Sequence, residues 1–392
     1  MSAQAAVAAT DQTLALPIAG APCWGSLLAA ALVLPGVVAA QDENGPGPGL
    51  VSVKWLSYQD RQPGLERIRV SAPSLLVRVP LDARWGGEAS LTADSVSGAS
   101  PRYHSAISGA SRMSEERRAG EIKLTRFEER SRYGLALVAS DERDYKSRTV
   151  AAEGRWNSED NNRSWNAAMA LTRDRIGSVD DTSLAEKRRT VEVSAGVTQA
   201  LTRADLLQFN LSHAWGSGFY SDPYKRLDHR PGGRHQTIAL LRWNHHVEAA
   251  DVTLRSSYRS YRDSFGIRSH TLSFEPVFTA AQRFTITPGL RLYSQTAARF
   301  YFDPVYSFAG APYPPGYFEA PPHYLSPDQR LSAFGAVTVG LKVAVQIDRH
   351  WNADLKLERY EQRGSWRVGG PGSPGLAPFQ ARFITWGLAR TF

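Results

Sequence analysis

Apolar and polar side chains alternate with a period of two residues along most of the chain after Leu50. Residues 351–358 show the pattern most simply, with apolar and polar residues taking turns: Trp351, Asn352, Ala353, Asp354, Leu355, Lys356, Leu357 and Glu358. Successive side chains of a β-strand point to opposite faces. A segment of this kind therefore predicts a strand with one apolar face and one hydrated face.

About sixteen such segments follow one another, and their connections differ in length. The segments lie near residues 50–58, 66–80, 84–95, 120–128, 133–141, 148–157, 164–173, 188–199, 205–215, 236–246, 251–260, 268–278, 283–293, 330–347, 350–360 and 379–392. The long connections lie near residues 97–118, 174–187, 216–235, 295–329 and 361–378. An even number of strands, with short turns at one end and longer loops at the other, is typical of bacterial outer-membrane barrels.

The composition also favours a barrel in a membrane. Mean hydropathy is −0.35, and yet the chain contains 10 Trp, 15 Tyr and 15 Phe. A transmembrane barrel presents an apolar face with aromatic girdles to lipid and keeps its interior polar. A soluble two-sheet protein would alternate too, but a chain of this length would usually show domain breaks, and none follows Leu50.

Beyond the N-terminal region, no stretch of sequence is long and apolar enough to form a membrane-spanning helix. Only helices and closed barrels satisfy every backbone hydrogen-bonding group in lipid. The predicted fold is therefore all-β: a transmembrane, antiparallel, up-and-down β-barrel of about 16 strands.

The N-terminal region predicts export. Residues 24–40 form a short apolar run ending in Val38, Ala39 and Ala40, a small-x-small cleavage pattern. We expect a signal peptide over residues 1–40, a flexible linker over 41–49 and the barrel over 50–392, in the outer membrane of a Gram-negative bacterium. Residues 1–23 contain no Lys or Arg, unlike ordinary signal peptides, so the true start codon and the cleavage site stay open.

Cys23 is the only cysteine and precedes the predicted cleavage site. A chain cleaved there would have neither a disulfide framework nor a Cys-ligated metal site. A lipoprotein anchored through Cys23 is the alternative, but the apolar stretch follows this cysteine and Ala21-Pro22 before it is a poor lipobox.

The last strand segment ends on Phe392, and the alternate residues before it are Arg390, Leu388, Trp386 and Ile384. A terminal aromatic residue preceded by alternating apolar side chains resembles the signal that the barrel-assembly machinery reads. We therefore expect Phe392 to be an assembly signal and this machinery to be a partner. Arg390 departs from the pattern.

The formal net charge is +8, with Lys and Arg spread through most segments and interleaved with Asp and Glu. Because there is no basic block, no nucleic acid is expected as a partner. Dispersed positive charge favours attraction to anionic solutes or to lipopolysaccharide phosphates. We expect outer-membrane lipid and lipopolysaccharide to be partners.

In each segment every second residue belongs to the polar set, and we expect these positions to line the barrel lumen. They carry both signs of charge, with an excess of Lys and Arg. The candidate lumen-lining residues are Lys54, Arg69, Glu88, Asp94, Lys123, Glu153, Arg155, Arg255, Arg259, Glu275, Arg291, Lys342, Lys356 and Glu358. Glu192, Arg283 and Asp354 share this parity.

These charges support two hypotheses of function. A sixteen-stranded barrel is wide enough for an aqueous channel, which predicts a porin-like channel or transporter for small polar solutes, anionic ones included. The alternative is a structural or interaction barrel with a plugged lumen that serves an envelope partner, since cross-strand ion pairs would need the same inward residues. The solute, the partner and the oligomeric state stay open.

The longest predicted loop, residues 296–329, is dense in Pro and aromatic residues. Loops of this length are usually functional or disordered. Three roles stay open for it: a constriction or plug folded into the lumen, an external cap, or a platform for aromatic ligands.

Neither an enzyme nor a cofactor or metal site is predicted. A lipid hydrolase would need a Ser–His pair near the rim, but Ser212 and His213 are adjacent and point to opposite faces of a strand. No G-x-S-x-G motif is present. The acids of residues 141–144 offer oxygen ligands for a cation such as Ca²⁺, but Arg143 among them favours a solvated, ion-paired rim.

Three short motifs resemble a known family of outer-membrane proteins, the DUF3570 family. They are residues 94–101 (DSVSGASP), 140–145 (SDERDY) and 221–225 (SDPYK). Singly each motif is common, and together they are fairly specific. The resemblance covers most of the chain after the linker and implies a barrel with no established activity.

Overall fold

The computed structural model describes residues 45–63, 65–99, 112–225, 227–303, 316–320 and 322–392. Among these, no helix has the length and apolar character needed to cross a membrane. The predicted signal peptide, residues 1–40, and the first part of the predicted linker lie outside the described residues.

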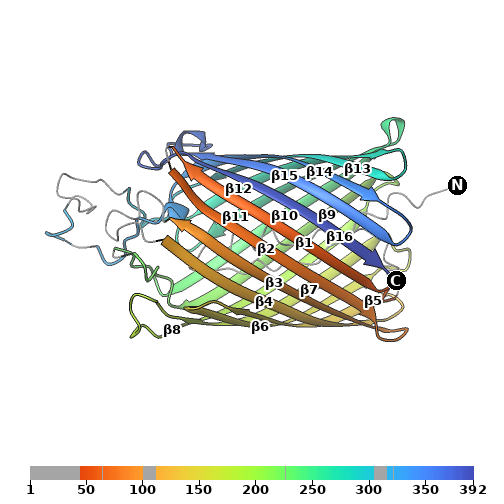
Figure 1. The fold of residues 1–392 in the computed structure, drawn as a ribbon, viewed down its shortest axis with the longest axis horizontal. Helices are drawn as coiled ribbons and strands as arrows, with labels where there is room; N and C mark the ends of the chain where they lie inside the picture. Colours follow the sequence, from red (N-terminus) through yellow and green to blue (C-terminus); the bar gives the residue numbers. More distant parts are fainter. Residues whose placement is uncertain (1–44, 64, 100–111, 226, 304–315, 321) are drawn as a thin grey trace.

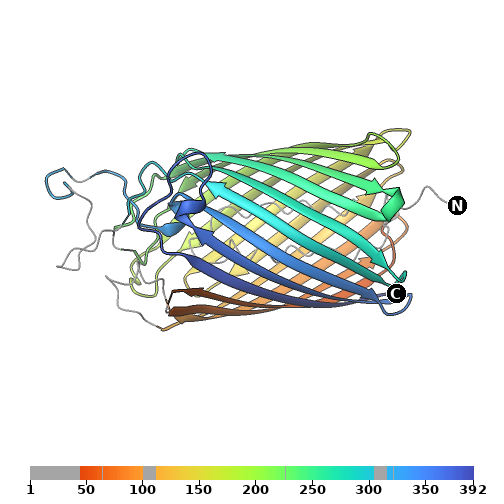
Figure 2. The ribbon, with the colours of Figure 1, turned by 90° about the horizontal axis from the view of Figure 1, so that it is seen from above.

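Sixteen antiparallel strands of the described chain close into one barrel, in which each strand pairs with its neighbours in sequence and β1 pairs with β16 (Figures 1 and 2). The strands are β1 (Leu50–Gln62), β2 (Leu65–Pro80), β3 (Trp85–Ala99), β4 (Arg112–Phe127), β5 (Ser131–Asp141), β6 (Tyr145–Asn157), β7 (Arg163–Ile176), β8 (Glu186–Ala200), β9 (Asp205–Gly218), β10 (Gly233–Val247), β11 (Val252–Asp263), β12 (Arg268–Ala280), β13 (Phe284–Gln295), β14 (Phe334–Gln346), β15 (Trp351–Arg363) and β16 (Phe379–Thr391). The predicted fold, an all-β antiparallel barrel of sixteen strands, is confirmed.

The seam between β1 and β16 closes the barrel. Its register runs from Leu50 opposite Thr391 to Arg61 opposite Gln380. Two further backbone hydrogen bonds extend it, because Gly49 and Phe392 each donate an N–H to the other's carbonyl at 2.9 Å. The Phe392 ring lies over Gly49, where a Cβ atom would approach it to 2.5 Å, so a larger residue at position 49 would displace this exposed ring. The assembly role of Phe392 stays a prediction.

The two ends of the barrel differ. The turn end carries the first residue of β1, the last residue of β16 and the short connections 81–84, 128–130, 158–162, 201–204, 248–251, 281–283 and 347–350. The loop end carries the long connections, including 219–232, 296–333 and 364–378, and these project at the left of Figure 1.

Side chains alternate between the two faces as predicted. On β7, the outward residues Trp165, Met169 and Leu171 are exposed, whereas Ala168 and Ala170 between them are buried. The same alternation exposes large apolar side chains around the outside of the barrel, among them Leu91, Ile122, Leu135, Leu137, Val150, Leu211, Leu241, Leu272, Leu292, Leu341, Leu357 and Ile384. So much exposed apolar surface on a folded chain fits contact with lipid.

All sixteen predicted segments correspond to strands, but most predicted segments are too short at the loop end, whereas the one predicted from residue 330 begins only at Phe334. The segment predicted over 50–58 continues to Gln62, and the one predicted over 164–173 continues to Ile176. Beyond the lipid-facing zone the outward residues become charged, as with Arg173 and Arg175, so hydropathy stops alternating while the strand goes on.

Leu137 and Val138, adjacent on β5, test the assignment of faces. Leu137 points outward and is 55% exposed, whereas Val138 points inward and lies opposite Glu121 of β4. Leu137→Arg is expected to lower the free energy of unfolding in bilayers by about 2–4 kcal/mol, the cost of a cation on the lipid face near the midplane. Val138→Arg should lose much less, because its charge would face Glu121. Urea unfolding of both variants in lipid vesicles makes the comparison, and equal losses would contradict the assignment.

Candidate functional site

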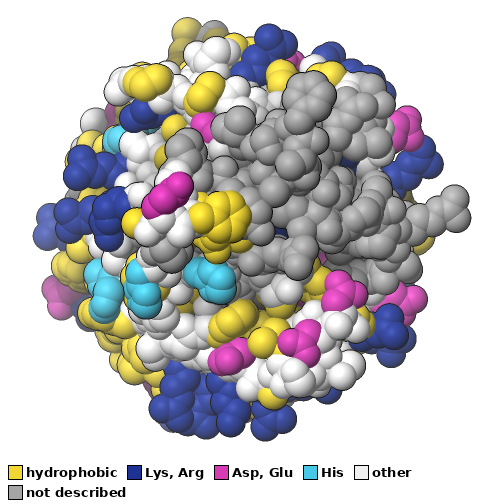
Figure 3. Space-filling view, turned by 90° about the vertical axis from the view of Figure 1, so that its left-hand side faces the viewer, with side chains coloured by type: hydrophobic (Ala, Val, Ile, Leu, Met, Phe, Trp, Pro, Cys, Tyr) yellow, Lys and Arg dark blue, Asp and Glu magenta, His cyan; other side chains and the backbone are white. Residues whose placement is uncertain are grey.

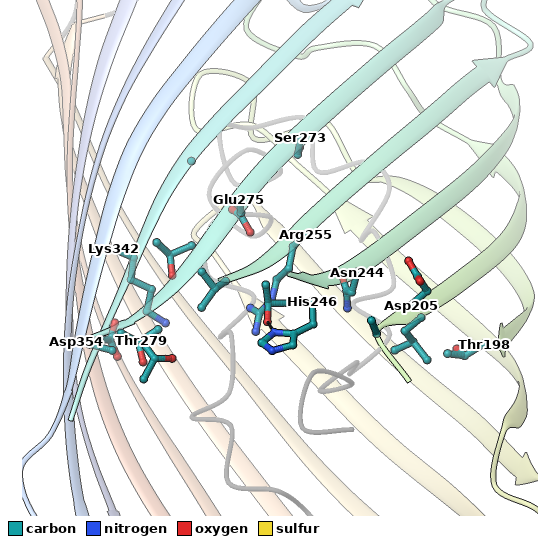
Figure 4. Close-up of a pocket in the computed structure, with 18 of the residues that line it drawn as sticks. Thr198, Asp205, Asn244, His246, Arg255, Ser273, Glu275, Thr279, Lys342 and Asp354 are labelled. Carbon is teal, nitrogen blue, oxygen red and sulfur yellow. Dashed lines mark hydrogen bonds between the residues drawn. The ribbon is translucent and has the colours of Figure 1, made fainter. Parts of the chain in front are cut away.

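A cavity of about 1190 Å³ occupies the lumen toward the turn end. Its lining includes inward residues of β10 to β15 together with turn residues such as Asn161 and Arg203. Figure 4 shows Arg255, Glu275 and Lys342 extending from the barrel wall toward this space. The cavity is the candidate functional site because it gathers charged side chains from many strands around one space.

The inward strand positions of the cavity lining carry more cations than carboxylates. The five cations are Arg155, Arg255, Arg291, Lys342 and Lys356, and the three carboxylates are Glu275, Asp354 and Glu358. The register of β14 and β15 brings two positive charges together, since Lys342 lies directly opposite Lys356. Glu358 offsets part of it through an ion pair with Lys356 at 3.0 Å. The inward strand positions of this wall are therefore mixed in sign but positive on balance. The rest of the cavity lining adds two cations and three carboxylates: Arg203, Arg283, Asp160, Asp205 and Glu248.

Glycines on neighbouring strands let long charged side chains lie flat against the wall. Gly387 of β16 lies opposite both Lys54 of β1 and Asp354 of β15. A Cβ atom at Gly387 would meet Asp354 Oδ1 at 2.7 Å and Lys54 Cγ at 3.2 Å. The space beside this glycine is thus filled by its charged neighbours, which keeps them out of the centre of the lumen.

The structure places all but one of the candidate lumen-lining residues on inward positions. Seven line the cavity itself: Arg155, Arg255, Glu275, Arg291, Lys342, Lys356 and Glu358. Lys54, Glu88, Asp94, Lys123, Glu153 and Arg259 also lie on inward positions. The sequence also predicts Glu192, Arg283 and Asp354 at inward positions. Arg283 and Asp354 line the cavity, whereas the side chain of Glu192 is buried in the wall.

Three cross-strand ion pairs hold part of the inward charge of β2 to β6. Arg78 pairs with Glu88 at 2.9 Å and Arg117 with Asp94 at 2.5 Å. Lys123 pairs with Glu153 at 2.5 Å. These six inward charges are therefore paired with one another.

The prediction for Arg69 is wrong. Its side chain is 67% exposed and pairs with the equally exposed Glu66 at 2.7 Å, whereas its neighbours Ile68 and Val70 are buried inside the barrel. Ile68 and Val70 pack inside the barrel with Tyr58. At these three positions of β2 the apolar side chains therefore face inward and the charged one faces outward, which reverses the pattern on which the prediction depends.

Four inward tyrosines lie beyond the cavity, toward the loop end, on one side of the barrel from β11 through β16 to β1. On four strands a Tyr hydroxyl donates to the carboxylate or amide oxygen two residues further on: Tyr58 to Asp60, Tyr261 to Asp263, Tyr293 to Gln295 and Tyr360 to Gln362, at 2.6–2.8 Å. We call Tyr58, Tyr261, Tyr293 and Tyr360 the tyrosine collar. None of them lines the cavity.

The collar is packed against other side chains. Tyr58 packs with Leu56, Ile68 and Val70, and Tyr360 packs against this cluster. Asp263 also accepts from Arg234, whose nitrogen lies 2.6 Å away. These contacts narrow the lumen at the loop end, where the inward positions change from charged to aromatic.

An ion network, which we call the cap network, joins the loop between β9 and β10 to the chain before β14. Asp328 is completely buried and contacts Arg230 at 2.6 Å, Arg330 at 2.5 Å and Lys225 at 3.2 Å. Asp222 pairs with Lys225 and Arg330, and Asp228 with Arg230. Three carboxylates thus meet three cations.

The charges of the cap network account for the titration of Asp328. Burial alone would raise its pKa, but Arg330, Lys225 and Arg230 hold the pKa of its carboxyl well below the ordinary value. Asp222, Asp228 and Asp328 lie close enough to share a cation. The three basic side chains already balance the charge of these three carboxylates, so we interpret the cap network as a structural ion cluster.

Aromatic packing accompanies the cap network. Phe265, 1% exposed, packs edge-on against Tyr220 and Phe300 at ring-centroid distances of 5.7 and 5.0 Å. Leu331 and Ala298 complete this cluster. The described ends of the predicted 296–329 loop thus form part of a cap over the loop end, and residues 304–315 and 321 lie outside the described residues.

The residues considered for catalysis are dispersed. His213 points outward beside Trp215, at a ring-centroid distance of 4.4 Å. In the acidic motif, Asp141 pairs with Arg148 at 2.9 Å, and Asp144 accepts a hydrogen bond from Tyr224. The described residues of this motif therefore take part in rim contacts.

The cap network makes a direct prediction. Asp328→Asn removes one charge from a buried cluster and should destabilise the cap by about 3–5 kcal/mol, because it leaves buried cations with too few carboxylates. Hydrogen–deuterium exchange should show faster exchange of the amides of residues 219–232. Glu66→Gln, which breaks an exposed ion pair at the same end, should cost at most about 1 kcal/mol. Equal effects of the two variants would contradict a structural role for the network.

Comparison with known proteins agrees with this geometry. A family model described as a protein of unknown function (DUF3570) matches residues 107–187 and 180–383. No curated protein matches the sequence significantly. The family assignment therefore brings no activity with it.

Solved structures of outer-membrane proteins resemble this chain, and one of them, with a TM-score above 0.5, supports the fold. A bacterial polysaccharide outer membrane secretin is similar with a TM-score of 0.52 and 8% identity, over 88% of this chain and 99% of that one. OccK9 (OpdG) of Pseudomonas aeruginosa matches with a TM-score of 0.45 and 12% identity, over 88% of this chain and 98% of that one. The siderophore receptor PirA of the same species gives 0.47 and 12%, over 87% and 62%. At these identities the likeness concerns the barrel fold alone.

Proposed function

The chain belongs to the DUF3570 family of outer-membrane barrels of unknown function, and from that premise we propose that it is a porin-like channel for small polar solutes, with anions favoured. The observation that carries the proposal is the cavity of about 1190 Å³ with five inward cations against three carboxylates on its strands. Rings of charge bias which ions enter a water-filled pore. A positive wall lowers the energy of an anion more than that of a cation of equal size.

The proposed orientation places the turn end in the periplasm and the loop end outside the cell. Short turns face the periplasm and long loops face outward in barrels of this class. Export by a cleaved signal peptide over residues 1–40 and recognition of Phe392 by the assembly machinery belong to the same proposal. The wide cavity then opens toward the periplasm, and the tyrosine collar lies nearer the outside.

The tyrosine collar and the cap favour a second candidate, a structural or interaction barrel closed at the loop end. Phe265, Asp328 and Ser332 are almost completely buried there, as in a packed plug. In the channel proposal the same elements form the narrowest part of the path and limit the size of the solute. The two candidates differ in whether ions cross the purified barrel.

Planar-bilayer recordings separate the two candidates. The wild-type barrel should give single-channel steps, and in a salt gradient its reversal potential should indicate a preference for anions. Lys342→Glu with Lys356→Glu converts two facing cations into carboxylates and should shift the reversal potential toward cation preference. Arg359→Glu with Arg382→Glu is the matched control, because this facing pair lies exposed on the outside of the barrel.

A folded barrel without conductance steps would refute the channel and favour the closed interaction barrel. Steps whose selectivity responds to the outward control pair as strongly as to Lys342 and Lys356 would refute the assignment of the positive wall. The absence of a catalytic role is part of the proposal, and hydrolysis of lipid by the purified barrel would contradict it.

A further inference from the structure

Six cations form a compact grid on the outside of the barrel, at the loop end of three adjacent strands. One row consists of Arg148, Arg173 and Arg189, which lie directly opposite one another on β6, β7 and β8. The second row consists of Lys146, Arg175 and Lys187 on the same strands. All six are exposed. We call these residues the cationic grid.

The strands themselves provide little compensation for this charge. Arg148 pairs with Asp141, the outward carboxylate of neighbouring β5, at 2.9 Å. Asp174 lies between Arg173 and Arg175 in sequence, but its side chain points inward and pairs with the buried Arg188 at 2.7 Å. Among the described residues, no ion pair joins the other five cations of the grid to a carboxylate.

Such an arrangement is unfavourable for an isolated barrel. Like charges directly opposite on antiparallel strands destabilise the pairing, and the grid contains four such contacts, two in each row. Neighbouring strands are about 4.8 Å apart, so each row of three charges spans roughly 10 Å. The arrangement becomes favourable once anions with several oxygens lie against it, because Arg binds phosphate through two parallel hydrogen bonds.

The position of the grid indicates where these anions come from. The outward row next to it, two residues closer to the turn end, is apolar: Val150, Leu171, Val191 and Trp215 lie opposite one another on β6 to β9. Trp is typical of the boundary between lipid and water. The grid therefore begins where the lipid-facing surface ends, at the depth of lipid headgroups.

Figure 3, which views the loop end, shows Lys and Arg side chains gathered at the periphery of the barrel, including its lower edge. That edge corresponds to the side on which Figure 1 labels β6 and β8. The strand positions of the grid place its six cations on the outer wall, so they face the surrounding membrane.

From this geometry we propose that the cationic grid is a binding site for phosphorylated lipid headgroups of the leaflet that surrounds the loop end. Five net positive charges remain after Asp141 is subtracted from the six cations. A phosphate monoester carries a charge of about −1.5 to −2, so about three phosphate groups would neutralise the grid. This site is separate from the lumen and does not depend on whether the barrel conducts.

Binding of a lipid that carries two phosphates tests the proposal. The refolded full-length barrel in neutral detergent is titrated with bisphosphorylated lipid A, with the same lipid after phosphatase treatment, and with inorganic phosphate. The wild type should bind the phosphorylated lipid and should bind the dephosphorylated lipid at least tenfold more weakly. Millimolar inorganic phosphate should not reduce its binding of the phosphorylated lipid. Equal binding of the two lipids, or competition by inorganic phosphate at that concentration, would overturn the proposal.

The variant Arg173→Gln, Arg175→Gln, Arg189→Gln removes half of the grid and should lose at least tenfold in affinity, since each cation near an anionic lipid surface contributes several-fold. The matched control replaces three outward arginines at the turn end, Arg126, Arg163 and Arg390, with Gln. The control should bind as the wild type does. A variant that binds as tightly as its control would overturn the proposal.

The unfolding temperature gives a second test, because a variant that merely folds badly would unfold at a lower temperature and not at a higher one. In neutral detergent without phosphorylated lipid, the grid variant should unfold at a higher temperature than the wild type, because cross-strand repulsion has been removed. Added phosphorylated lipid should raise the unfolding temperature of the wild type more than that of the variant. A grid variant that unfolds at a lower temperature in neutral detergent, or that gains as much from the lipid, would contradict the proposal.

Discussion

Backbone hydrogen bonding in a medium without water is the constraint on which the whole structure depends. A strand in lipid has no solvent partners for its N–H and C=O groups, so a sheet of such strands must close on itself. Here β1 pairs with β16 over its whole length, and Gly49 and Phe392 add the final pair of bonds. Once the sheet is closed, alternation leaves one face for lipid and the other for the lumen.

The sequence predicts this much well because alternation depends on only two classes of side chain. The sixteen strands and the inward positions of residues such as Lys342 and Glu358 follow from parity. The assignment of residues to the inner or outer face fails where polar and apolar residues no longer separate between the two faces of a strand, or where the polar residues face outward. At Arg69 the two inward neighbours on β2 are apolar, and the end of β7 beyond Arg173 carries charge on both faces.

The loop end lay beyond sequence reasoning for a different reason. The cap network unites Asp222 and Arg230 of one connection with Asp328 and Arg330 of another, about a hundred residues away. No local spacing connects these residues, and a long aromatic loop is equally compatible with a plug, a cap and a ligand platform. Only their position in space shows that described parts of both connections pack into one cap.

The lining of the lumen therefore differs between the two ends of the barrel. Toward the turn end the lumen is a polar cavity with a positive wall, and toward the loop end tyrosines, ion pairs and aromatic packing narrow it. Outside, an apolar surface gives way to exposed cations at the same end. The closed wall separates the charged face of the lumen from the charged rim outside.

The central claim is that adjacent residues of one strand face water and lipid in turn, with the water reached from the turn end. Single cysteines at Lys342, Leu341, Glu358 and Leu357, introduced with Cys23→Ser, test it by thiol labelling in vesicles. A water-soluble maleimide added at the turn end should label positions 342 and 358 rapidly, whereas 341 and 357 should react only with a lipid-soluble reagent. Equal labelling of neighbouring positions, or the reverse pattern, would contradict the account.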